Sequence, residues 1–140
     1  MTIAGDTEPV ATMDRPWFTE AVAAPTAEEM LTAYVPGSSA VLARVAPIMR
    51  VLEAAVANDP EVAALWPQDE DPRYVVQRAA ADALVAKPGA RKDLTTEEAA
   101  DLLYGILSPE LYLLFVRDRN WSHDRWVDWA TNTLHAQLCA

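Results

Sequence analysis

The segment from Glu98 to Val116 carries apolar residues at most of its positions, and this density limits the folds open to the chain. As a helix, it would present apolar side chains around its whole axis, so other parts of the protein must cover it on every side. The segment after Ser122 repeats large residues at i, i+3, i+4 and i+7 from Trp126 to Leu138, which is typical of a helix lying along another helix. We therefore expect the two segments to form half of a four-helix bundle that a second copy of the chain completes.

A homodimer is thus the predicted assembly, because 140 residues form one domain that cannot hide two such segments alone. The interface is expected on the large side chains of both segments. These are Leu111, Tyr112, Phe115, Trp126, Trp129, Leu134 and Leu138.

Helices dominate the predicted secondary structure. The sequence has only 4 glycines and no stretch that alternates β-branched and polar residues, which favours an all-α antiparallel bundle of about five to seven helices. Capping side chains precede prolines at Asp59-Pro60, Asp71-Pro72 and Ser108-Pro109, and capping boxes begin at Thr26 and Thr95. We predict helices at 27–35, 38–57 with a bend near Pro47, 60–66, 72–86, 96–107, 109–118 after a kink, and 123–138.

Two regions are expected along the chain. Residues 1–25 are rich in Thr, Pro and Ala, and we expect an irregular N-terminal arm anchored by Trp17 and Phe18. Residues 26–140 form the helical domain.

The acidic balance of the sequence argues against negatively charged partners. With 21 acidic and 11 basic residues the formal charge is -10, so the surface repels phosphate backbones and anionic membrane faces. The first 14 residues do not read as a signal peptide, and Ser108-Pro109-Glu110 breaks the longest apolar run. We expect a cytoplasmic protein that itself contacts neither nucleic acid nor membrane.

The residue patterns of common catalytic and metal sites are missing from the sequence. His123 and His135 would stand about 18 Å apart along one helix, too far to share a metal. His135 and Cys139 are four residues apart, yet two ligands at a chain terminus make a weak site. Asp69, Glu70 and Asp71 are better explained as a solvated loop that ends in a helix cap. We therefore predict no enzyme, no metal and no cofactor.

Binding of a small apolar molecule is the more plausible kind of site, because such ligands are held by large apolar side chains and a few polar groups. A core role for any one of the candidates remains open. Arg78 lies among apolar residues of a helix, where it points outward, pairs with an acid, or binds an anionic ligand. The candidate ligand-binding residues are Tyr34, Met49, Tyr74, Arg78, Leu103 and Leu107.

The C-terminal part resembles TetR-type bacterial transcriptional regulators, notably their actinobacterial branch. The resemblance rests on the Ser108-Pro-Glu-Leu-Tyr112 break, the charged link that ends at Trp121-Ser122, and the Trp-rich last helix. It extends upstream over 40–52, 59–66 and 94–103, and so covers nearly the whole chain. The resemblance implies that 26–140 is an effector-binding and dimerisation domain.

The departure from this family lies at the N-terminus, where members carry a helix-turn-helix that enters the DNA major groove. We expect this chain to lack that DNA reader, and we note that Pro36-Gly37 interrupts a helix that is usually continuous. One alternative is an interaction module that pairs with full-length regulators and inhibits them. Another is a small helical enzyme that uses Arg78, Tyr74 and Asp82.

Overall fold

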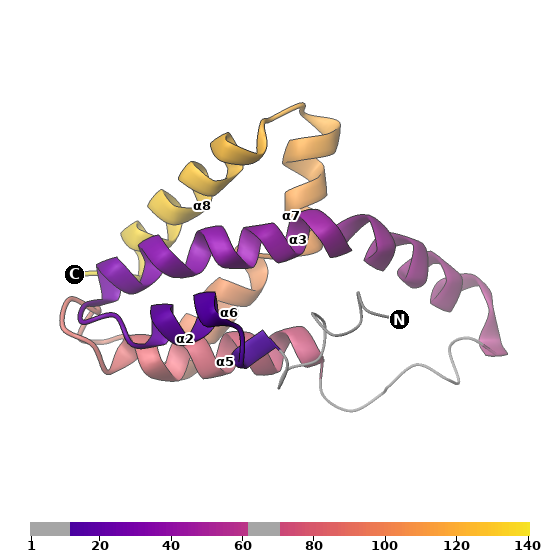
Figure 1. The fold of residues 1–140 in the computed structure, drawn as a ribbon. Coiled ribbons are helices and arrows are strands. Elements are labelled where there is room, and N and C mark those ends of the chain that lie inside the picture. The colour runs from indigo at the N-terminus through magenta and orange to yellow at the C-terminus, as the bar shows by residue number, and fades with distance from the viewer. Residues whose placement is uncertain (1–11, 62–70) are drawn as a thin grey trace.

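The computed structural model describes residues 12–61 and 71–140, and all of its regular elements are helices (Figure 1). The prediction of an all-α fold is confirmed. The helices are α2 (Pro16–Val22), α3 (Ala27–Asn58), α5 (Pro72–Val85), α6 (Thr96–Ile106), α7 (Pro109–Leu113), the π-helix η2 (Leu114–Asp118) and α8 (His123–Leu138).

Helix starts follow the predicted capping residues. The side chains of Thr26 and Thr95 accept hydrogen bonds from backbone N–H groups three residues later, as capping boxes require. Ser108 and Ser122 do the same for α7 and α8, and Asp71 accepts from the N–H of Arg73 at the start of α5. The Asp59 cap is also present, while most of the helix predicted at 60–66 lies outside the described residues.

The long helix α3 corrects one prediction. We expected separate helices at 27–35 and 38–57, but Pro36 and Pro47 both lie inside a single helix. A proline in a helix interior costs about 3 kcal/mol because it removes a hydrogen bond. The residues beside Pro36 are buried, Val35 at 0% exposure and Ser38 at 8%. Tertiary packing therefore holds the helix together where local preference would end it.

Helix α2 corrects a second prediction, because residues 16–22 of the expected irregular arm are helical. The anchoring role expected of Trp17 and Phe18 is confirmed: Phe18 is 5% exposed, and both rings lie within 6 Å of the Tyr34 ring. The ammonium group of Lys87 donates to the carbonyl oxygens of Val22 and Ala24, at 2.5 and 2.7 Å. A contact from a distant loop thus satisfies carbonyl groups at the end of a short helix.

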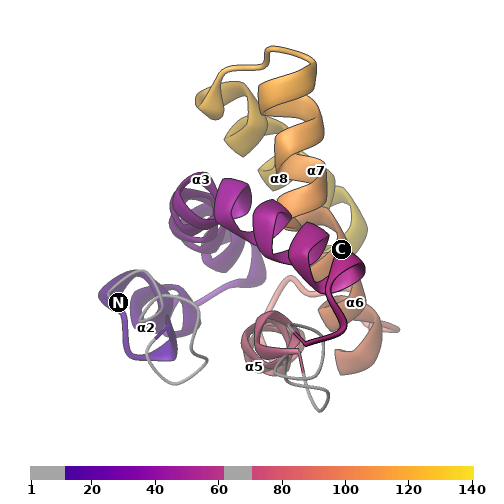
Figure 2. The same cartoon turned by 90° about the vertical axis from the view of Figure 1, so that its right-hand side faces the viewer.

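Helix α3 runs through the middle of the fold, with α7 and α8 on one side and α2 and α5 on the other (Figures 1 and 2). Helix α6 lies against both α5 and α8. The second half of α3 extends beyond the other helices (Figure 1). It carries three exposed apolar side chains, Ile48, Val51 and Leu52.

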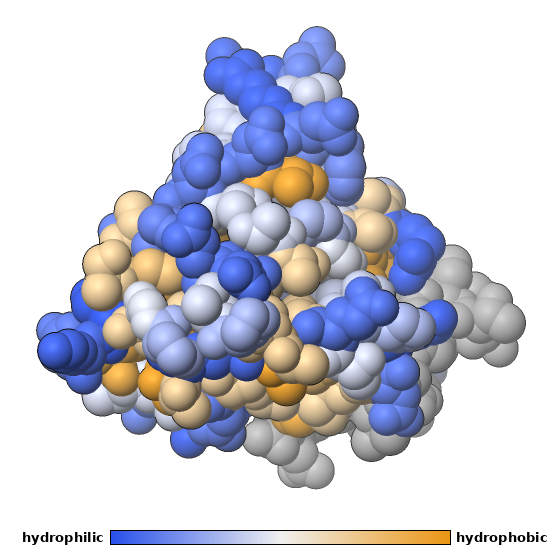
Figure 3. Space-filling view, turned by 60° about the vertical axis from the view of Figure 1, so that its left-hand side comes forward, coloured by the Kyte–Doolittle hydropathy of each residue, from blue (hydrophilic) through white to orange (hydrophobic). Residues whose placement is uncertain are grey.

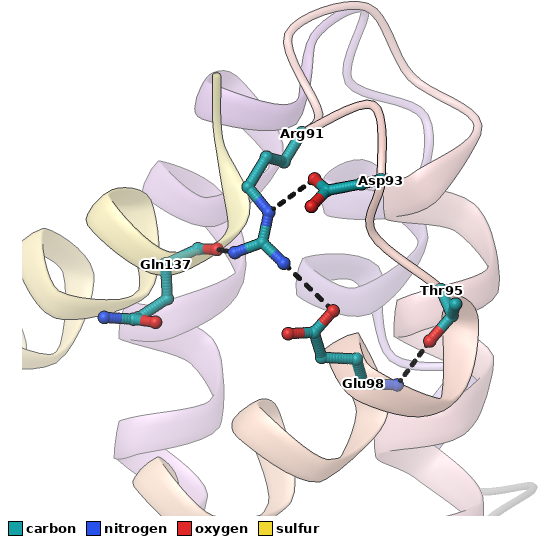
Figure 4. Close-up of polar contacts among 5 residues, drawn as sticks. All are labelled: Arg91, Asp93, Thr95, Glu98 and Gln137. Atoms are coloured by element: carbon teal, nitrogen blue, oxygen red, sulfur yellow. Dashed lines mark hydrogen bonds and ion pairs between the residues drawn. The ribbon is translucent and has the colours of Figure 1, made fainter.

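The C-terminus is fixed to the loop between α5 and α6. Arg91 donates from Nη1 to the Gln137 carbonyl at 2.6 Å, from Nε to Asp93 and from Nη2 to Glu98, both at 2.9 Å (Figure 4). The backbone N–H of Arg91 donates to the Leu138 carbonyl, and that of Ala140 to the Gly89 carbonyl. The end of α8 is thereby held in place.

The predicted kink in the penultimate apolar segment is confirmed, because α6 ends at Ile106 and α7 begins after Ser108. Among the described residues, the stretch Thr96–Asp118 is long and apolar enough to span a bilayer by length and composition alone. Its residues Leu103, Leu107 and Leu113 belong to the hydrophobic core. A core helix passes the same test of length and composition.

Candidate functional site

Three of the six candidate ligand-binding residues belong to the core. Leu103 and Leu107 are 0% and 1% exposed. Tyr34 is equally buried, donates its hydroxyl hydrogen to Gln77 Oε1 at 2.8 Å, and has a strongly raised pKa because of burial. A buried hydroxyl needs such a partner, so Tyr34 and Gln77 form an internal polar link between α3 and α5.

The other three candidates lie in different places. Arg78 is exposed on α5, which is the outward orientation left open by the sequence. Met49 is half-buried on the second half of α3. Tyr74 lies at the start of α5, where its ring meets that of Tyr104 edge to face with centroids 5.4 Å apart. Only Tyr74 therefore joins a polar group of residues.

That group, here called the junction cluster, lies where four helices approach one another. Tyr104 of α6 donates its hydroxyl hydrogen to Asp71 Oδ2, the cap of α5. The guanidinium of Arg73 stacks over the Tyr104 ring at 4.4 Å. The charges of Glu110 on α7 and of Arg73 act on both Glu53 of α3 and Tyr104. The junction cluster consists of Glu53, Asp71, Arg73, Tyr74, Tyr104 and Glu110.

Arg73 is the unusual member of the junction cluster. Its side chain is 22% exposed, and Nη2 lies 3.7 Å from Asp71 Oδ2, which is an ion pair too long for a hydrogen bond. Its Nε and Nη1 atoms are buried and have no hydrogen-bond partner among the described residues. Leaving a buried donor unsatisfied costs about 1–3 kcal/mol, and more for a charged group.

The surroundings raise the pKa values of two groups in the junction cluster. Desolvation is the first cause that raises the pKa of Glu53, followed by the charge of Glu110, while the charges of Arg50 and Arg73 lower it. Desolvation also raises the pKa of Tyr104, and its hydrogen bond to Asp71 adds to the effect. The shift of Glu53 favours its neutral form, and Tyr104 keeps its hydroxyl hydrogen for the bond to Asp71.

The candidate ligand-binding residues predicted from the sequence include Arg78 and not Arg73. One signal for Arg73 was available in the sequence. Arg73 follows Pro72 in the first turn of the helix, where the partial positive charge of the helix N-terminus makes a cation unfavourable. That unfavourable position distinguishes Arg73 from Arg78, which lies in mid-helix.

The predicted dimer interface requires a correction. Trp126, Leu134 and Leu138 are 0% exposed in the single chain, and Tyr112 is 5% exposed. The indole N–H of Trp126 donates to Ser39 Oγ of α3 at 3.1 Å. The apolar stripe of α8 therefore lies along a helix of its own chain, and these residues are not available to a partner.

The remaining interface candidates lie on the arm formed by α7, η2 and the first half of α8. Phe115 stacks on Trp121 with ring centroids 4.5 Å apart, and Trp129 meets Phe115 at 5.2 Å. The side chains of Leu111, Phe115 and Trp129 are half-buried. That of the neighbouring Leu114 is 46% exposed. Figure 3 shows a largely hydrophilic tip on this arm with an apolar patch below it.

A cavity of about 440 Å³ lies at the C-terminal end, away from the junction cluster. His135 and Cys139 both line it, and His135 Nε2 is 3.5 Å from Glu28 Oε2. Within residues 12–61 and 71–140, no group of three or more His, Cys, Asp or Glu side chains is arranged to hold a metal. The cavity therefore offers a thiol and a contact between histidine and glutamate side chains.

In the part of the chain that the structure describes, the buried side-chain donors without a hydrogen-bond partner belong to Arg73, so the junction cluster is the candidate functional site. A comparison of the chain with protein-family models, curated proteins and solved structures finds no match.

Proposed function

We propose that this chain is the ligand-sensing and dimerisation domain of a TetR-type transcriptional regulator, and that it binds a small amphipathic molecule at the junction cluster. The observation that carries the proposal is the guanidinium of Arg73, which lies against the Tyr104 ring. Its buried Nε and Nη1 atoms have no hydrogen-bond partner among the described residues. Unpartnered polar groups beside aromatic surface are what a small-molecule site requires.

The position of the junction cluster fits a sensor. Its members come from α3, α6, α7 and the start of α5, so a bound molecule would contact helices that are distant in the sequence. A ligand that binds one arrangement of these helices more tightly than another shifts the population towards it. Such a shift is the physical basis of coupling between a ligand site and a remote surface.

The first test is ligand binding. A panel of small amphipathic molecules is screened by thermal unfolding, because a ligand at 100 times its Kd stabilises the native state by about 2.7 kcal/mol. We expect stabilising compounds whose effect is lost in Tyr104→Ala but kept in Tyr112→Phe, a tyrosine change outside the junction cluster. Failure of every compound to stabilise the wild type would count against the sensing role.

Homodimerisation is the second half of the proposal, and the arm is its surface. Leu114 is exposed there beside the half-buried Leu111, Phe115 and Trp129. Leu111, Phe115 and Trp129 are kept from the interface predicted from the sequence, and Leu114 is added. The buried residues Tyr112, Trp126, Leu134 and Leu138 are no longer part of it. Aromatic side chains such as Phe115 and Trp129 are enriched at the centres of protein interfaces.

A competing surface is the second half of α3, where Val51 is 69% exposed between Ile48 and Leu52. Light scattering after size exclusion gives the oligomeric state of the wild type and of Leu114→Glu and Val51→Glu. The proposal expects a dimer that Leu114→Glu converts to a monomer and Val51→Glu leaves intact. The reverse pattern would move the interface to α3, and a monomeric wild type would exclude a homodimer.

The exposed stripe on α3 also favours a second candidate function, an interaction module that pairs with a full-length regulator and inhibits it. Operator binding by an intact homologue, measured with and without this chain, tests that function. Unchanged operator binding would contradict it. A cytoplasmic location is part of both candidate functions, because each acts on a transcriptional regulator.

A further inference from the structure

We infer that the molecule bound at the junction cluster carries a carboxylate, and that this group accepts hydrogen bonds from the guanidinium of Arg73. The inference rests on the proposed sensing function, since it specifies the chemistry of the ligand at the same site. It concerns the polar end of the molecule, and the aromatic rings of Tyr74 and Tyr104 receive its apolar part.

The acceptors near Arg73 are already engaged. Asp71 Oδ1 accepts from the backbone N–H of Arg73 at 2.9 Å, and Asp71 Oδ2 accepts from the hydroxyl of Tyr104. Asp71 is therefore occupied through both oxygens, and its ion pair with the guanidinium stays at 3.7 Å. If Asp71 turned towards Arg73, it would give up the cap of α5 or the Tyr104 contact.

Two glutamates also belong to the junction cluster. Desolvation and then the charge of Glu110 raise the pKa of Glu53, which favours its neutral form. A neutral carboxyl group repels an incoming anion less than an ionised one does. Arg50 and Arg73 both act on Glu53 and add positive charge to the surroundings.

The guanidinium itself selects the ligand group. Its fixed, planar set of N–H donors matches the two oxygens of a carboxylate, and charge-assisted hydrogen bonds are roughly twice as strong as neutral ones. Stacking on Tyr104 holds the plane of the guanidinium before a ligand arrives. A preoriented donor loses less side-chain freedom on binding, which favours affinity.

The apolar part of the ligand is expected to meet aromatic surface. The edge-to-face pair of Tyr74 and Tyr104 lies next to the guanidinium. Met49, half-buried on α3, precedes Glu53 by one helical turn and so shares its side of the helix. An alkyl or aryl chain attached to the carboxylate fits these neighbours.

The test compares matched carboxylates and neutral analogues. Octanoate, 4-butylbenzoate, octanol and the methyl ester of 4-butylbenzoate are titrated into the full chain by calorimetry. Arg73→Gln is the test variant, and Arg78→Gln is the control because Arg78 is an exposed arginine on the same helix. We expect at least one carboxylate to bind at least tenfold more tightly than its neutral analogue, and Arg73→Gln to remove that preference while Arg78→Gln keeps it.

A second readout separates a ligand contact from a structural one. Nε and Nη1 of Arg73 have no hydrogen-bond partner among the residues that the structure describes. Arg73→Gln is therefore expected to leave the melting temperature of the ligand-free protein unchanged or to raise it. A clear fall in the melting temperature of the free variant would indicate a structural arginine and overturn the inference.

The outcomes also separate the inference from the proposed function. If neutral compounds bind as tightly as carboxylates and Arg73→Gln binds both normally, the carboxylate inference is wrong and the sensing function stands. If no compound of the panel binds, the carboxylate inference is overturned together with the sensing site.

Discussion

The indole ring of Trp17 lies directly over Gly37, on the outside of helix α3. A Cβ atom placed on Gly37 would be 2.3 Å from Cε3 of Trp17 and 2.4 Å from Cδ2, well inside van der Waals contact. The same ring lies 5.6 Å from the ring of Tyr34, centroid to centroid. The missing side chain of a glycine within a helix therefore provides the place where α2 docks.

Gly37→Ala is predicted to destabilise the protein by about 1–3 kcal/mol, the usual cost of overpacking. The substitution gains about 1 kcal/mol of helix propensity, but the Trp17 ring must move away, and its contact with Tyr34 changes. Urea unfolding followed by tryptophan fluorescence measures both the free energy and the displaced indole.

Gly105→Ala is the matched control, because Gly105 is also inside a helix and a Cβ there would meet nothing within 4 Å. The variant is expected to be more stable than the wild type by about 0.5–1 kcal/mol. Equal changes in the free energy of unfolding for Gly37→Ala and Gly105→Ala would show that the Trp17 contact does not contribute to the docking of α2.

The hydrogen bond from Trp126 to Ser39 gives a second prediction. Both side chains are 0% exposed, and the bond joins α8 to α3. Ser39→Ala is expected to lower the free energy of unfolding by about 1–3 kcal/mol, because it leaves a buried indole N–H without a partner. Chemical denaturation of the single variant gives the value.

A double-mutant cycle with Trp126→Phe isolates the bond from the change in volume. The phenylalanine has no N–H, so Ser39→Ala should cost less in its background, with a coupling of about 0.5–1.5 kcal/mol. Additive changes in the free energy of unfolding would mean that water accepts the hydrogen bond of the indole N–H when the Ser39 hydroxyl is removed.

Local signals in the sequence predicted the helix boundaries well. Thr26, Thr95 and Ser108 act through side-chain hydrogen bonds that span only three residues, so a single stretch of sequence contains both partners. The continuity of α3 through Pro36 was not predictable in this way, because the packing that stabilises it comes from residues far along the chain.

Periodicity also failed to identify which helix covers α8. A stripe of Trp126, Leu134 and Leu138 has the same spacing whether it is buried by α3 of one chain or by a second copy. The junction cluster was missed for a related reason. Glu53 and Glu110 read as helix-surface residues, and only the fold brings them into the same cluster as Arg73.

Lys87 gives a third prediction, because its ammonium group joins the end of α2 to the loop after α5. Lys87→Met keeps most of the apolar stem but removes the donors to the carbonyls of Val22 and Ala24. We expect a loss of about 1.5–3 kcal/mol per hydrogen bond made by the charged group, reduced where water replaces it. Thermal unfolding compares Lys87→Met with Lys92→Met, which changes an exposed lysine of the same loop. Equal melting temperatures would contradict the capping role.

Glu53→Gln tests the electrostatic repulsion between Glu53 and Glu110. The pKa of Glu53 is raised in the folded protein, first by desolvation and then by the charge of Glu110, so its contribution to stability is complete below the unfolded pKa of a carboxyl group. That contribution is lost as the pH rises through the raised pKa, because Glu53 then ionises near Glu110. A glutamine at this position carries no charge at any pH.

We therefore expect Glu53→Gln to melt at a higher temperature than the wild type at pH 8 and at the same temperature near pH 4. The gain should be about 0.2–1 kcal/mol, because Glu53 is largely exposed and solvent screens the interaction. Glu20→Gln, which removes an exposed carboxylate from α2, controls for the change in net charge. A gain of the same size at both pH values would show that repulsion between ionised Glu53 and Glu110 is not its source.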